Sequence, residues 1–81
     1  MSLKATIKDI TLAASRNETT YEVEVTASGG TPSFEEVKSA ASRQVGLAAR
    51  QMYPREPKFN LKLIEWRAQN LWLVTLVAKP V

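Results

Sequence analysis

Residues 71–79 read LWLVTLVAK, and the eight residues from Leu71 to Ala78 are all uncharged. Successive side chains of a β-strand point to opposite faces of its sheet, so a strand with one face in water alternates apolar and polar residues. Residues 71–79 lack that alternation. They therefore predict a strand that is apolar on both faces, and each of those faces needs a cover.

The preceding segment, KFNLKLIEWRA at residues 58–68, predicts a second strand, and Gln69-Asn70 predicts the turn of a hairpin. A two-residue turn places Ala68 opposite Leu71. This register divides the hairpin into two faces. One face is expected to carry Phe59, Leu61, Leu63, Trp72, Val74, Leu76 and Ala78, and the other Ile64, Trp66, Leu71, Leu73 and Val77 together with Lys62.

The first part of the chain predicts another hairpin. Residues 21–27, YEVEVTA, alternate apolar and polar side chains without a break and predict a strand with one face in water. Residues 3–12, LKATIKDITL, alternate until Asp9, where the phase slips by one residue. A β-bulge near Asp9 accounts for that slip, and the small polar residues 13–20 are expected to form the connecting loop.

A helix is expected over residues 32–53. Pro32 suits its first turn, Ser33 and Glu36 have the spacing of a capping box, and Pro54 stops it. At about 100° per residue the apolar side chains form one narrow stripe, which predicts that the helix packs on one face of a sheet. The stripe consists of Phe34, Val37, Ala41, Val45, Ala48 and Met52.

The elements follow the order ββαββ. They predict an α+β fold in one small domain spanning residues 1–81, with a four-stranded, mainly antiparallel sheet and one helix packed on one face. A single helix covers only one face of such a sheet. Leaving a large aliphatic side chain of the other face in water forgoes about 1.5–3 kcal/mol of burial free energy, and a flat apolar strand in water is prone to aggregate.

A second protein surface is therefore expected on the uncovered face. The predicted interface consists of Ile64, Trp66, Leu71, Leu73 and Val77. A second copy of the chain is the simplest cover, packed as a twofold dimer, although a different protein partner serves equally well. The function predicted first is thus a small non-enzymatic interaction or assembly domain that self-associates through the open face of its C-terminal hairpin.

Charge is distributed unevenly along the chain, whose formal net charge is +3. Residues 1–36 carry three basic and six acidic side chains, whereas residues 37–81 carry eight basic and two acidic ones. This asymmetry suits an acidic partner, and basic residues within positions 38–67 support an alternative function as a nucleic-acid-binding module. The candidate residues for phosphate contacts are Arg43, Arg50, Arg55, Lys58 and Lys62. A solvated helix face explains the two helical arginines more simply.

The chain contains no Cys and no His, which excludes thiol nucleophiles, disulfides and imidazole acid–base chemistry. Glu22 and Glu24 share one strand face, where a ladder of surface charges opposite Lys4 and Lys8 is a simpler interpretation than a catalytic pair. No catalytic constellation, metal site or cofactor is expected. No uncharged run is long enough for a membrane-spanning helix, and a cytoplasmic location is expected.

Overall fold

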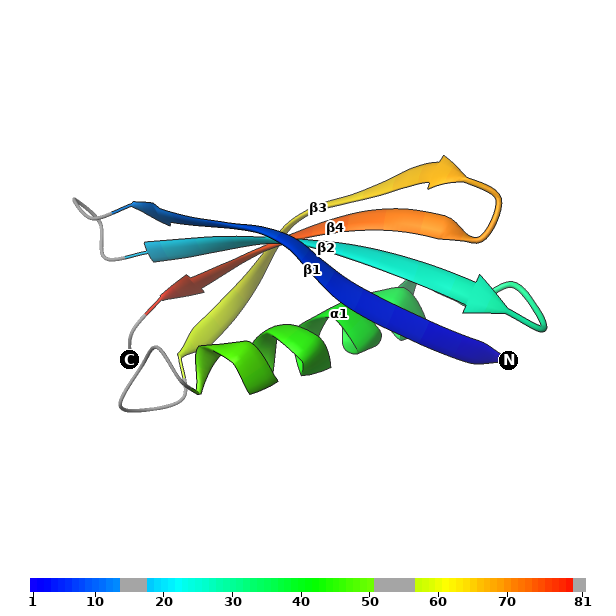
Figure 1. The fold of residues 1–81 in the computed structure, drawn as a ribbon, viewed down its shortest axis with the longest axis horizontal. Helices are drawn as coiled ribbons and strands as arrows, with labels where there is room; N and C mark the ends of the chain where they lie inside the picture. The colour runs from blue at the N-terminus through cyan, green and yellow to red at the C-terminus, as the bar shows by residue number, and fades with distance from the viewer. Residues whose placement is uncertain (14–17, 51–56, 80–81) are drawn as a thin grey trace.

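The computed structural model describes residues 1–13, 18–50 and 57–79. Its elements are β1 (Ser2–Ala13), β2 (Glu18–Ser28), α1 (Phe34–Ala49), β3 (Lys58–Ala68) and β4 (Leu71–Lys79). This order confirms the predicted ββαββ fold: the four strands form one sheet, and α1 lies along one of its faces (Figure 1).

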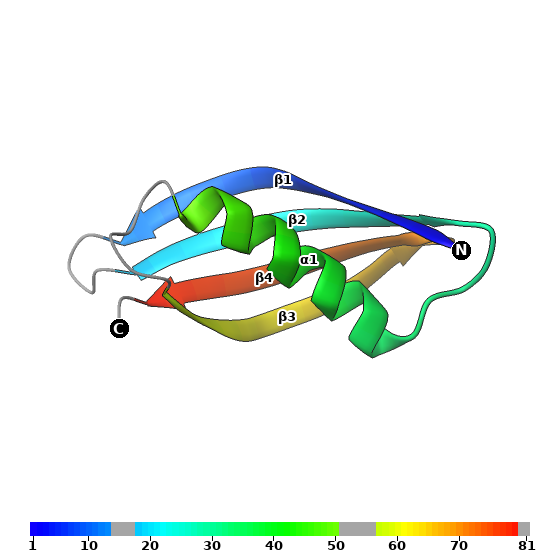
Figure 2. The ribbon, with the colours of Figure 1, turned by 90° about the horizontal axis from the view of Figure 1, so that it is seen from below.

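The strands lie in the order β1-β2-β4-β3, and each neighbouring pair is antiparallel. The two hairpins join through β2 and β4, which pair from Thr19↔Ala78 to Thr26↔Leu71. The strand β4, uncharged from Leu71 to Ala78, is therefore central, and β1 and β3 are the edges. Figure 2 shows α1 crossing the sheet diagonally, from β3 at its N-terminal end toward β1 at its C-terminal end.

The first hairpin is longer than its sequence pattern indicated. β1 and β2 pair as far as Ala13↔Glu18, so Glu18, Thr19 and Thr20 belong to β2 and not to the predicted loop over residues 13–20. Pairing with β4 on the other side explains the extension, because it satisfies backbone groups of Thr19 and Thr20 that a loop would leave to water. The register shifts between Ile7 and Asp9, which confirms the predicted bulge.

The second hairpin has the predicted bounds, and Ala68 lies opposite Leu71 as expected. Asn70 takes a positive φ of 60°, a conformation that Asn tolerates better than most residues. The Ala27 backbone N–H donates to the Asn70 carbonyl at 3.0 Å. The turn between β3 and β4 is thereby tied to the end of β2.

Helix α1 begins two residues later than predicted, because Ser33 is its N-cap and Pro32 precedes it. The expected capping box is present: the Glu36 N–H donates to Ser33 Oγ at 3.2 Å, and the Ser33 N–H donates to Glu36 Oε1 at 3.0 Å. Arg50 is the C-cap, and the predicted last turn, residues 51–53, lies outside the described residues.

The core lies between α1 and the two central strands. The helix buries the apolar stripe Val37, Ala41, Val45 and Ala49. From the sheet, the buried side chains are Tyr21, Val23, Val25, Val74, Leu76 and Ala78. Phe34, which the sequence pattern placed on the helical stripe, is 57% exposed, because it lies at the first residue of the helix.

Candidate interaction surfaces

The sheet face opposite α1 carries an apolar patch with no covering layer among the described residues (Figure 1). Cross-strand pairing places Leu71, Leu73 and Val77 of β4 on this face, opposite Thr26, Glu24 and Thr20 of β2. All three apolar side chains are partly exposed. The sequence prediction for these three residues therefore agrees with their placement.

Two of the five predicted interface residues lie on the other face, and that part of the prediction is wrong. A register shift between Leu61 and Leu63 makes Lys62 an extra residue, so Ile64 pairs with the buried Val74 and packs against the core. Trp66 pairs with Trp72, which also contacts the core. Both therefore face α1, although Trp66 remains 68% exposed near the end of β3.

The same bulge brings Leu63 to the uncovered face, where the sequence analysis had not placed it. Leu63 pairs with Thr75, is 49% exposed and lies beside the apolar side chains of β4. The spacing Leu61, Leu63, Ile64 was the available signal, because apolar residues at that spacing cannot all share one face of a regular strand. We name Leu63, Leu71, Leu73 and Val77 the open-face patch.

Acidic side chains border the open-face patch on both sides. Leu73 pairs with Glu24 of β2 and with Glu65 of β3. Glu24 lies 4.0 Å from Lys8 Nζ across the first hairpin, and Glu65 forms an ion pair with Arg67. The apolar centre with a charged rim is typical of protein interfaces.

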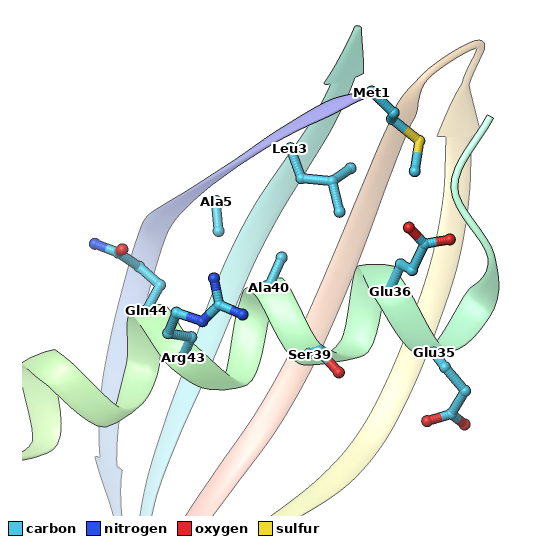
Figure 3. Close-up of a pocket in the computed structure, with 9 residues that line it drawn as sticks. All are labelled: Met1, Leu3, Ala5, Glu35, Glu36, Ser39, Ala40, Arg43 and Gln44. Carbon is cyan, nitrogen blue, oxygen red and sulfur yellow. The ribbon is translucent and has the colours of Figure 1, made fainter. Parts of the chain in front are cut away.

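A second surface lies at the opposite edge of the sheet, between β1 and the first half of α1. Here an open groove of about 500 Å³ separates the strand from the helix. Leu3 and Ala5 line it from β1, and Ala40, Arg43 and Gln44 from α1, as Figure 3 shows. We name this surface the edge groove.

Apolar side chains extend the edge groove toward the C-terminal end of β1. Ile10 and Leu12 pair with Tyr21 and Thr19, so they lie on the helix side of the sheet, yet they are 46% and 62% exposed. Leu47, three residues after Gln44 and on the same helical flank, is 54% exposed. The helix side of β1 is thus apolar over most of the strand.

The basic residues proposed for phosphate contacts are not gathered in one place. Arg43 lines the edge groove beside β1, whereas Lys58 and Lys62 belong to β3, at the opposite edge of the sheet. Arg50 caps the end of α1, and Arg55 lies outside the described residues. Glu35 and Glu36 also line the groove that contains Arg43. The continuous acid-free patch on which the nucleic-acid alternative depends is not formed by the described members.

The carboxylates of the described residues show no grouping suited to a metal ion. Asp9 and Glu22 are cross-strand neighbours, but Asp9 Oδ1 accepts the N–H of Ile10 at 3.0 Å. Within residues 1–13, 18–50 and 57–79, no three acidic side chains come together as candidate ligands. Hydrogen bonds from the Ser33 backbone, and then from its side chain, lower the pKa of the Glu36 carboxyl below its ordinary value of 4.5.

No protein-family model, curated protein or solved structure matches the chain. In the part of the chain that the structure describes, α1 is too short and too polar to cross a bilayer.

Proposed function

We propose that this protein is a non-enzymatic assembly domain that forms a homodimer through the open face of its sheet. The open-face patch carries the proposal, since four aliphatic side chains of a central and an edge strand gather on the sheet face that α1 does not cover. The cytoplasmic location expected from the sequence is part of this proposal.

A twofold dimer with β4 at its centre suits the arrangement of side chains. Leu73 of each copy then packs near the axis, in a layer that excludes water from Leu71, Val77 and Leu63. Glu24 and Glu65 flank Leu73, and each has an ion-pair partner within its own copy, Lys8 and Arg67 respectively. Apolar burial then supplies most of the association free energy.

The substitution Leu73→Lys tests this dimer. Full burial of a leucine is worth about 1.5–3 kcal/mol, and roughly half of that is left for the interface because Leu73 is already partly buried within one copy. Two copies contribute, so the dimer should lose about 2 kcal/mol, which raises its Kd by roughly 30-fold. A charged ammonium in the interface adds to this loss.

Sedimentation equilibrium measures the effect directly. The wild-type chain should sediment as twice its 9.0 kDa mass at micromolar concentrations, and Leu73→Lys as a monomer. Leu12→Lys is the matched control, because it makes the same replacement at a 62% exposed strand position outside the patch. A wild-type monomer at all concentrations, or an equal effect of both substitutions, would contradict the proposal.

A further inference from the structure

The N-terminal half of β1 offers the longest regular free edge of the sheet. Among the described strands β1 pairs only with β2, and its register is unbroken from Ser2 to Ile7. The other edge strand, β3, shifts register twice, so its longest regular stretches are Lys58–Leu61 and Leu63–Trp66. An unpaired strand edge presents backbone N–H and C=O groups that can pair with a further strand.

The edge groove lies directly beside this free edge. Its lining comes from Met1, β1 and α1, and no residue of β2, β3 or β4 takes part. Leu3, Ala5 and Ala40 provide apolar surface, and its volume of about 500 Å³ accommodates several side chains of an added strand. Figure 3 shows the Arg43 and Gln44 side chains extending from α1 toward β1.

The two faces of β1 differ in charge, and this difference determines which side chains suit a strand added to its free edge. Lys4 and Lys8 project to the open face of the sheet, as the Lys8–Glu24 contact shows for Lys8. Lys4 has no ion-pair partner among the described residues. The groove itself holds Arg43 near one end and Glu35 and Glu36 near the other, so its own side chains do not favour an acidic segment, and the preference comes from the lysines of the open face.

We propose that the edge groove binds an extended segment of a partner protein in which apolar and acidic residues alternate. The segment adds to β1 as a fifth strand over Ser2–Ile7. Its apolar side chains enter the groove against Leu3, Ala5 and Ala40, and its carboxylates lie beside Lys4 and Lys8. Strand addition of this kind obtains affinity from main-chain hydrogen bonds and specificity from alternate side chains.

The inner edge of β1 already holds a strand of this chemistry. Residues 21–27 of β2, YEVEVTA, alternate apolar and acidic side chains, and they pair with β1 as Ala5↔Val25, Thr6↔Glu24 and Ile7↔Val23. A side chain of β1 can contact a neighbouring strand on either side of β1. A strand similar to β2 on the outer edge therefore lies beside the same lysines. The bulge after Ile7 ends the regular edge and limits the added strand to about six residues.

A synthetic peptide provides the probe. The sequence TYEVEVTA, copied from residues 20–27 and labelled with fluorescein, is titrated with the intact protein, and binding is followed by fluorescence anisotropy at low salt. A second peptide carries Glu22→Lys and Glu24→Lys. The acidic peptide should bind at least about fivefold more tightly, since reversing two exposed charges changes the free energy by about 1 kcal/mol.

Substitutions in the protein locate the site. Lys4→Glu should weaken binding of the acidic peptide about fivefold, whereas Lys62→Glu makes the same charge change on the far edge strand and should have no effect. Ala40→Glu places a charge in the groove and should also weaken binding, while Ser42→Glu on the other helical flank should not. Hydrogen exchange should slow at the amides of Ser2–Ile7 and not in β3.

Four results would overturn the proposal. The first two are that the peptide does not bind, or that the acidic and basic peptides bind equally well. The third is that Lys4→Glu and Lys62→Glu have equal effects on peptide binding. The fourth is that hydrogen exchange of the β1 amides slows when the protein concentration is raised without any peptide. The last result means that a second copy of the chain occupies the edge. Leu73→Lys separates the two proposals, because it should abolish the dimer and leave peptide binding unchanged.

Discussion

The bulge at Lys62 decides which of two neighbouring residues of β3, Leu63 or Ile64, faces the core. Alanine substitutions test that assignment. Regular alternation over residues 58–68 predicts that Leu63 is in the core and Ile64 outside it. The register of β3 and β4 gives the opposite assignment. Ile64 packs against the core opposite Val74, and Leu63 is 49% exposed on the open face. Ile64→Ala and Leu63→Ala should therefore differ in their effect on the free energy of unfolding.

The size of the difference follows from burial. Each substitution removes three carbon atoms, and burial of one methylene group is worth about 0.8 kcal/mol. Ile64 is partly buried and leaves a cavity against the core, so Ile64→Ala should cost roughly 2 kcal/mol. Leu63 is half exposed and leaves no enclosed cavity, so Leu63→Ala should cost about 1 kcal/mol or less.

Urea unfolding followed by circular dichroism gives both free energies. The measurements belong in the Leu73→Lys background, so that association through the open-face patch does not add to the cost of Leu63→Ala. Ile10→Ala, at a 46% exposed position of the other edge strand, gives the loss of strand propensity for an exposed isoleucine. In thermal unfolding the expected difference of about 1 kcal/mol corresponds to roughly 4–8 °C in Tm. A larger cost for Leu63→Ala than for Ile64→Ala would refute the bulge.

Two further predictions concern α1. Gly46→Ala should stabilise the protein by up to about 1 kcal/mol, measured as a higher urea midpoint, because Ala has the higher helix propensity and, apart from the nearby backbone of α1 itself, an added Cβ meets no atom of the described residues within 4 Å. A loss of stability would show that something outside the described residues approaches this glycine. Glu36→Gln should reduce the dependence of stability on acid pH. The Glu36 carboxyl has a lowered pKa in the folded protein, so its contribution is present above about pH 4.5 and is lost as the pH falls through the folded pKa. Urea midpoints between pH 3 and pH 7 should then fall less steeply for the variant, and identical profiles would contradict the prediction.

Much of the fold could be predicted from local patterns. The uncharged run at residues 71–78 predicted a strand with two apolar faces, and in the structure β4 is central, with α1 over one of those faces. Ser33 and Glu36 predicted the start of a helix because a capping box needs only residues three apart. The slip in alternation at Asp9 predicted a bulge, since strand periodicity is strictly two.

The candidate surfaces depended on contacts between distant segments. Strand alternation alone could not decide which residue of β3 bulges, because the pattern Leu61, Leu63, Ile64 is compatible with either face until β4 and α1 bury one of them. Pairing of β2 with β4 joined the two hairpins and left β1 as an edge. The diagonal path of α1 then opened the groove beside that edge (Figure 2). Local sequence therefore determined the elements and their caps, whereas the tertiary structure decided the faces, the edges and the space between them, because these depend on long-range pairing and packing.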